Sequence, residues 1–342
     1  PRLFGLAHIS TAKVCMTEFD EAWESANEAL EVARRFGNRQ YESEVLAMPV
    51  PFCLLREGEF DQASEAATKA HQIGSQIGAA GGESTAAYVM AEISMMRGEY
   101  ERSIDWATNA ADVANGAGMF FISAAALSAA GMAHLEISSD FVDKTVEAHQ
   151  EAIRLMEMPF GEAYGGMIWA ELGFCALALG QTDMASELFD KGLNNSNAAQ
   201  LMARPMHLVG SSFLSMGQGN MEDAASGIAE AREFVDERKM KHLDPIIAFA
   251  EANLAGALGE AECALERFAY AEERASMMKM RPWVWQSRAG AAQILAGAGR
   301  TEEATMKLDQ ARETVDEIAG LFNDDNLRQK YLDSMEAKLA TP

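Results

Sequence analysis

Apolar and small residues recur along this chain with a period of about forty residues. A short phrase repeats: a glycine, one residue, an apolar and often aromatic residue, two more residues, then a small residue, as in Gly58–Ala63 and Gly98–Ser103. Copies of this phrase start near positions 17, 58, 98, 139, 180, 219, 259 and 299. Small or apolar residues follow four and seven positions after the last residue of most copies, which is helical spacing. The pattern predicts eight pairs of helices, each pair turning at its phrase.

The chemistry of the phrase supports this interpretation. Glycine adopts the left-handed conformation that ends many helices, and an acidic residue favours the start of the next helix. The small residue allows two antiparallel helices to approach closely. Thr17 replaces the glycine in the first copy, and Lys144 replaces the small residue in the fourth. We therefore expect an all-α array over residues 1–320.

The small residues, turn glycine and aromatic residue of the phrase resemble the tetratricopeptide repeat (TPR) family. Its usual repeat is 34 residues, and repeats of about forty are similar to the C-terminal arrays of bacterial signalling ATPases and class III adenylate cyclases. The resemblance implies a right-handed α-solenoid of about eight TPR-like helical hairpins. It also implies a role in protein–protein interaction rather than one particular partner.

The two ends of the array differ in sequence. Residues 321–342 are expected to form a C-terminal capping helix and tail, in which Asp324 or Asp325 is the N-cap. One face of that helix would be apolar, with Leu327, Tyr331, Leu332, Met335 and Leu339. The chain begins within the first helix, so its N-terminal face is expected to need an upstream segment, a partner or a second copy in a homodimer.

The net charge disfavours some classes of partner, and the cysteine spacing disfavours some classes of site. The 28 Lys and Arg residues against 52 Asp and Glu give a net charge of −24, which disfavours direct binding to nucleic acid or an anionic membrane. Solubility explains such a charge, and a basic partner or an acidic cytoplasm are the alternatives. No run of 18 apolar residues predicts a membrane span. The four cysteines have no metal or redox spacing and are expected to be buried thiols in a reducing, cytoplasmic compartment.

Candidate catalytic and cofactor motifs fail when their remaining requirements are checked. Gly78–Thr85 has glycines but not the lysine of a phosphate-binding loop. Ser10 and Lys13 have serine–lysine spacing, but no Lys-Thr-Gly segment accompanies them. The six histidines are scattered without metal-ligand spacing. The sequence predicts no enzyme, cofactor or metal site.

The first helix of each pair is expected to line the concave face, where a partner would bind. Counting back from the turns gives a row that is rich in Met and Phe and suits a protein or peptide with an apolar or amphipathic segment. The alternative is that the same side chains form the core of the array. The row is Met48, Phe52, Leu55, Arg56, Tyr88, Glu92, Met95, Met96, Met167, Phe174, Met206, Phe213, Met216, Phe249 and Asn253.

A second candidate surface is basic. Two groups of cations end second helices one period apart and are expected to share an edge that could bind an anion or an acidic partner: Arg238, Lys239 and Lys241, then Lys279 and Arg281. The alternative is that these cations only complement the helix dipoles.

The sequence therefore predicts a cytoplasmic protein-interaction scaffold or sensor module, as part of a larger bacterial signalling regulator. A sensor for a small hydrophobic ligand or a peptide, and a self-associating structural module, are the alternatives. Because a repeat scaffold serves many unrelated tasks, the fold does not identify the partner.

Overall fold

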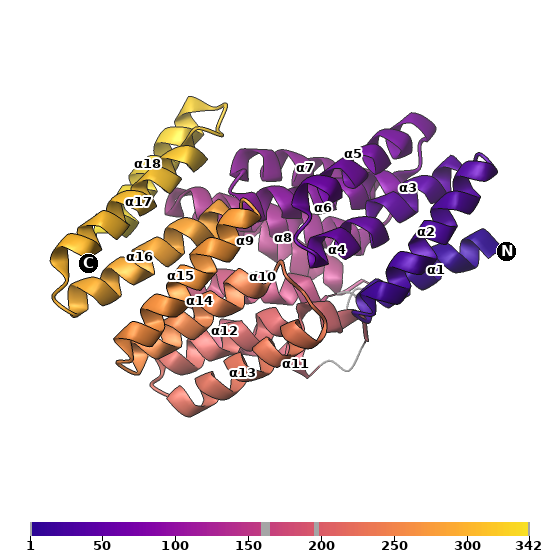
Figure 1. Ribbon diagram of the computed structural model, residues 1–342. Helices are drawn as coiled ribbons and strands as arrows, with labels where there is room; N and C mark the ends of the chain where they lie inside the picture. Colours follow the sequence, from indigo (N-terminus) through magenta and orange to yellow (C-terminus); the bar gives the residue numbers. More distant parts are fainter. Residues whose placement is uncertain (1, 159–164, 195–197, 341–342) are drawn as a thin grey trace.

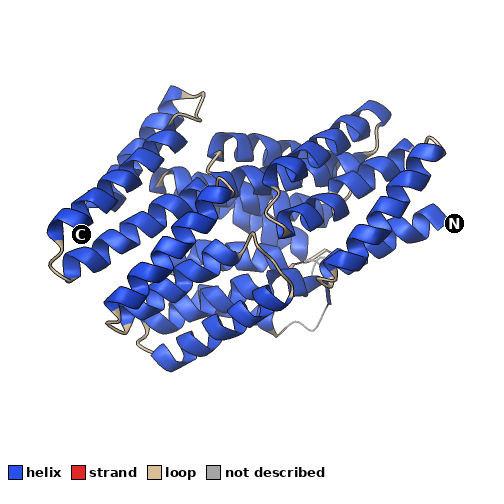
Figure 2. Ribbon diagram, viewed as in Figure 1, coloured by secondary structure: helices blue, strands red, loops and turns tan. Residues whose placement is uncertain are grey.

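A computed structural model describes residues 2–158, 165–194 and 198–340. Helices joined by short turns make up these ranges, which contain no strand (Figure 2). The all-α solenoid predicted from the repeats is confirmed. The helical pairs, in chain order, are α1 (Arg2–Cys15) with α2 (Phe19–Arg35), α3 (Arg39–Ala47) and α4 (Pro49–Arg56) with α5 (Phe60–Ile77), α6 (Ala80–Arg97) with α7 (Tyr100–Gly116), α8 (Phe120–Ile137) with η1 (Ser139–Phe141) and α9 (Val142–Met156), α10 (Gly166–Ala178) with α11 (Thr182–Leu193), η3 (Ala198–Ala203) and α12 (Arg204–Gly217) with α13 (Met221–Glu237), α14 (Asp244–Ala257) with α15 (Ala261–Met277), and α16 (Arg281–Gly297) with α17 (Thr301–Ala319).

The repeated phrase forms the turn inside each pair. Gly58 and Gly98 have φ values of +82° and +77°, and Thr17 adopts the same left-handed conformation at +60°. The aromatic residue that follows, such as Phe60 or Tyr100, is buried between the two helices of its pair and their neighbours. The turn and the core contact are therefore set by the same six residues.

The first helix of the second pair is broken. Met48 has φ −128° and ψ −66° between α3 and α4. Pro49 and Pro51 have no backbone N–H, so two hydrogen bonds of a continuous helix cannot form. The break leaves Phe52 and Leu55 on a separate short helix.

The C-terminal helix α18 (Asp325–Ala340) closes the array. The Oδ1 atom of Asp324 accepts hydrogen bonds from the backbone N–H groups of Asn326 (2.7 Å) and Leu327 (3.2 Å), which is an N-cap. Tyr331, Met335 and Leu339 are buried in one cluster with residues of α17. At the other end α1 contacts η3.

Two expectations need correction: that no segment is long and apolar enough to span a membrane, and that all four cysteines are buried. Helix α8 is 18 residues long with a mean hydropathy of 1.5, enough in length and composition to cross a membrane, and 61% of it is buried inside the array. A core helix passes the same test, because its neighbours surround its apolar faces. Cys53 and Cys175 are buried as expected, but Cys15 is only half-buried and Cys263, on α15, is exposed.

The array coils until its C-terminal pairs contact its N-terminal pairs (Figure 1). The backbone N–H of Lys241 donates to the carbonyl oxygen of Arg56 (2.7 Å), and the N–H of Asn323 donates to Glu101 (2.6 Å). Leu55 and Phe60 share one buried cluster with Met278 and other residues of the C-terminal pairs. The array therefore encloses its own concave face.

Replacing Gly98 by Ala is expected to destabilise the chain more than replacing Gly299 by Ala. Both glycines are left-handed, at φ +77° and +75°, so each substitution strains the backbone by about 1 kcal/mol. A Cβ at position 98 would also stand 3.1 Å from Ile318 and 3.3 Å from Pro282, whereas nothing lies within 4 Å at position 299. Thermal unfolding followed by circular dichroism measures the difference. Equal losses would show that the contact between distant pairs adds nothing.

Candidate functional site

The first helices of the pairs surround a cavity of about 220 Å³ near the middle of the array. Helices α4, α6, α8, α10, α12, α14 and α16 all contribute side chains, together with the segment that precedes α14. Most of the lining is apolar, and methionines from several helices are prominent. The lining includes Phe52, Tyr88, Glu92, Met95, Glu136, Glu171, Phe174, Met206, His242 and Trp283.

The cavity brings together nine of the fifteen predicted partner-binding residues. All nine lie on the first helices of their pairs, which agrees with the expected concave face. They are Phe52, Leu55, Tyr88, Glu92, Met95, Met96, Met167, Phe174 and Met206. Their role in binding a partner stays a prediction.

The other six predicted residues lie outside the cavity. Met48, Phe213 and Met216 pack against the large core cluster, and the ring of Phe249 contacts those of Phe268 and Trp283 at centroid distances of 5.7 and 5.5 Å. The amide of Asn253 donates to the carbonyl oxygen of Phe249, 2.7 Å away. Arg56 is buried and pairs with Asp20 at 2.6 Å. Asn253 therefore bonds within its own helix, and the other five side chains contact neighbouring helices instead of lining the cavity.

Three carboxylates give the apolar cavity its electrostatic character. Glu92, Glu136 and Glu171 line it, and none of the described lining residues is Lys or Arg. Burial raises the pKa of Glu92 to about 7. Burial, and then the charge of Glu92, hold the pKa of Glu171 well above its usual range. The two side chains are therefore close enough for the charge of one to oppose that of the other.

Two polar atoms at the cavity are buried without a hydrogen bond. They are Oε2 of Glu171 and Nδ1 of His242, considering the part of the chain that the structure describes. Burial also lowers the pKa of His242 to about 4, so its imidazole is neutral near pH 7. Unsatisfied buried polar atoms are rare in proteins and call for a physical explanation.

Glu136 and Glu171 were not among the residues predicted from the sequence. Each is the only acidic residue of its helix, within FFISAAALSAAGMAHLEI in α8 and GMIWAELGFCALA in α10. A single acidic residue in an otherwise largely apolar helix was the signal that could have found them. His242 was not selected either, because it lies before α14 and outside the counted row.

The fold resembles solved helical-repeat proteins. A Rap protein in complex with competence and sporulation factor matches with a TM-score of 0.64 at 12% identity, over 94% of this chain and 100% of that one. A tetratricopeptide repeat protein from Parabacteroides merdae (TM-score 0.43, 14% identity, 86% and 99% covered) and yeast Tom70 (0.32, 13%, 99% and 89%) also match. This chain has a TPR-type helical repeat fold. No family model and no curated protein sequence matches it.

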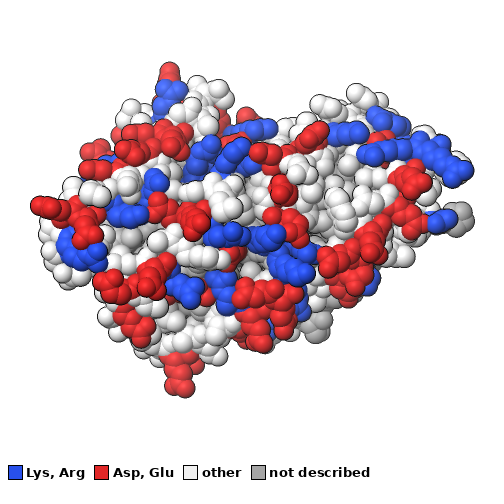
Figure 3. Space-filling model, in the orientation of Figure 1, with Lys and Arg blue, Asp and Glu red and all other residues white. Residues whose placement is uncertain are grey.

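The predicted basic edge of this TPR-type array contacts its own N-terminal pairs. Lys241 pairs with Glu57 at 2.6 Å and Lys279 with Asp61 at 3.0 Å. The Arg238 guanidinium donates to the hydroxyl of Thr17 (2.9 Å), that of Arg281 donates to the carbonyl oxygen of Arg97 (3.1 Å), and Lys239 is exposed. Figure 3 shows basic side chains across the middle of this face with acidic ones on either side. These contacts help to close the array, and binding of a separate anion stays a prediction.

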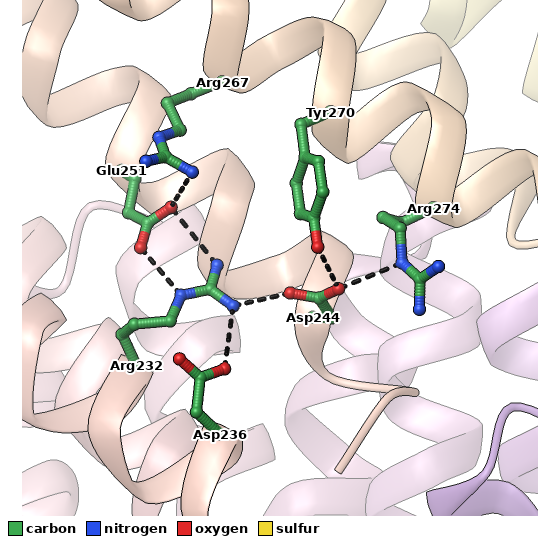
Figure 4. A network of polar contacts seen from close by, with 7 residues as sticks. All are labelled: Arg232, Asp236, Asp244, Glu251, Arg267, Tyr270 and Arg274. Carbon is green, nitrogen blue, oxygen red and sulfur yellow. Dashed lines mark hydrogen bonds and ion pairs between the residues drawn. The ribbon is translucent and has the colours of Figure 1, made fainter. Parts of the chain in front are cut away.

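A polar network outside the cavity joins α13, α14 and α15 (Figure 4). Asp244, at the first position of α14, accepts hydrogen bonds from Arg232 (2.5 Å), Tyr270 (2.8 Å) and Arg274 (3.0 Å). Arg232 also donates to Glu251 at 2.8 Å. Because each charge in this network has an opposite charge beside it, the network stabilises the packing of the helices and offers no free group for chemistry.

Proposed function

We propose that this chain is a protein-interaction module that binds a short peptide segment in the cavity enclosed by its first helices. The observation that carries the proposal is the convergence of seven first helices on one apolar cavity. A solenoid needs only contacts between neighbouring pairs to be stable. A lined internal space shared by distant pairs is an additional feature that suits a bound segment.

The lining fits a flexible apolar segment. Met95, Met206 and other methionines have unbranched side chains that adapt to different apolar groups. Tyr88, Phe174 and Trp283 provide rigid aromatic surfaces, which are frequent anchors in peptide-binding interfaces. The likeness to the Rap protein solved with its factor is in fold alone, and it supports the proposal by showing that this architecture accommodates a bound factor.

A wholly apolar small molecule is a weaker candidate. It would offer no hydrogen bond to the carboxyl groups of Glu92, Glu136 and Glu171, and burying a carboxyl group without a hydrogen bond is unfavourable in either protonation state. A peptide carries backbone and side-chain donors that these carboxylates can accept. Within the same proposal, the forty-residue period supports a place in a larger cytoplasmic signalling regulator, because it resembles the arrays of such proteins.

Selection from a displayed library of random hexapeptides tests the proposal. Peptides enriched on the native chain are expected to bind at least about tenfold more weakly to Met206→Trp, which fills the cavity from α12. The control is Met306→Trp, which adds the same ring to an exposed position of α17 and should leave binding unchanged. Circular dichroism confirms that both variants are folded. Failure to enrich any peptide, or equal binding to both variants, would overturn the proposal.

A further inference from the structure

We infer that the peptide bound in this cavity presents a cationic group, a lysine or arginine side chain or its own terminal ammonium, to Glu92 and Glu171. This inference rests on the proposed function and specifies the chemistry of the ligand. Glu92 comes from α6 and Glu171 from α10, so the two carboxyl groups reach the cavity from different pairs of the array. The charge of Glu92 raises the pKa of Glu171, so the two groups are close enough for one cation to interact with both.

The chain itself supplies no counter-ion at this place. None of the described residues that line the cavity is Lys or Arg, and no ion pair of the described chain includes Glu92, Glu136 or Glu171. By contrast, partly buried carboxylates elsewhere have cations beside them: Asp244 pairs with Arg232, and Glu272 pairs with Arg288 at 2.7 Å. The absence of such a partner distinguishes the cavity from the structural networks.

The nearby polar groups do not replace a cation. His242 is neutral near pH 7, because burial lowers its pKa to about 4. Burial, and then the charges of Glu92 and Glu171, raise the pKa of Tyr88, so its hydroxyl stays neutral. Oε2 of Glu171 is buried without a hydrogen bond in the described chain, although the hydroxyl of nearby Ser128 lowers the pKa of this carboxyl. A ligand ammonium or guanidinium would provide both the missing donor and the missing charge.

The apolar lining suits the rest of such a ligand. The alkyl stem of lysine or arginine can lie along Met95 or Phe174 while its charged head reaches the carboxylates. The aromatic faces of Tyr88 and Trp283 can contact a cation directly. An acidic peptide would instead add negative charge near Glu92 and Glu171, whose ionised forms already oppose one another.

A positional hexapeptide library tests the inference. Pools carry lysine at each position in turn, and matched pools carry acetyl-lysine, which has the same stem without the charge. We expect lysine pools at one position to bind at least about tenfold more tightly, since hydrogen bonds to charged groups are typically worth a factor of about ten or more. Pools with free and with acetylated N-termini distinguish a side-chain cation from the terminal ammonium.

Two variants test whether Glu92 and Glu171 cause the preference for lysine over acetyl-lysine. Glu92→Gln with Glu171→Gln keeps the shape of both side chains and should abolish the discrimination between lysine and acetyl-lysine. Glu302→Gln, at an exposed position of α17, should preserve it. If charged and neutral pools bind equally well, the inference is wrong and the proposed function stands. If no pool binds at all, the proposed function fails and the inference falls with it.

Discussion

Replacing Asp244 by Ala is expected to lower the free energy of unfolding by about 3 kcal/mol, because the change removes the buried carboxylate that pairs with two partly buried arginines. Asp244 is buried and joins Arg232 of α13 to Tyr270 and Arg274 of α15. Arg232 keeps Glu251 as a partner, which sets the expected loss at the lower end for buried pairs. Chemical denaturation followed by circular dichroism measures it.

Asp236→Ala is the matched control for this prediction. Asp236 belongs to the same network, but it is exposed and lies 3.6 Å from Arg232 on the same helix. Exposed pairs of this kind contribute about 0.5 kcal/mol or less. Hydrogen exchange in α13 and α15 should increase for Asp244→Ala alone. Similar losses for the two variants would show that the network does not depend on the buried carboxylate.

The repeated architecture could be predicted because its signals are local. The left-handed turn at Gly58 and the N-cap at Asp324 each depend on residues within one turn of chain. The proline-rich stretch around Pro51 interrupts the small-residue pattern, and the structure has a helix break there. Such features follow from backbone chemistry that does not change with the distant surroundings.

Closure of the array could not be predicted in the same way. It depends on the small rotation between successive pairs, summed over several repeats, and no short pattern encodes that sum. Lys241 and Glu57 are 184 positions apart, so nothing in the sequence around Lys241 indicates that Glu57 is its partner. The interpretation of Arg238 to Arg281 as a free basic edge considered only neighbours one period away.

The candidate site could be predicted only in part, because it also depends on how distant pairs are arranged. Counting along first helices found Tyr88, Glu92 and Phe174, because their spacing to the turn fixes the face on which they lie. The same count also selected Phe213 and Phe249, whose rings pack against neighbouring helices instead. Which of these side chains faces the cavity depends on how the pairs curve. Glu171 was missed because the predicted row was chosen mainly for apolar residues, and Glu171 is the one acidic residue in an apolar helix.

The double variant Glu92→Gln with Glu171→Gln is expected to be more stable than the native chain at about pH 8 and similar to it at about pH 5. The pKa of Glu92 is raised to about 7 by burial, and that of Glu171 is raised further above its usual range by burial and by Glu92. In the unfolded chain both groups titrate near pH 4.3. The native chain therefore holds protons that the unfolded chain has released.

This difference fixes the sign of the pH dependence. Where the folded state binds more protons than the unfolded state, stability falls as pH rises. The loss begins above about pH 4.3 and continues through about pH 7 for Glu92. Glutamine does not titrate, so the double variant escapes the loss.

Comparison with the variant is necessary because other groups act in the opposite direction. Burial lowers the pKa values of His149, His207 and His242 to about 4, so their contribution to stability grows as pH rises from about 4 to 6.5. These histidines are unchanged in the variant, and His242 is the one that shares the cavity. Thermal unfolding of both chains from about pH 5 to pH 8 therefore isolates the carboxylates, with Glu302→Gln as the surface control.

The same measurement connects stability to the proposed ligand. A cation bound between Glu92 and Glu171 favours their ionised forms, so it should release protons on binding and stabilise the native chain more at about pH 8 than at about pH 5. A lysine-containing hexapeptide from the library is the probe, and the double variant should gain little from it at either pH. A native chain whose stability relative to the variant does not fall with pH would contradict the assignment of raised pKa values to this pair. The carboxylates would then be ionised and solvated at neutral pH, and no ligand cation would be needed to balance them.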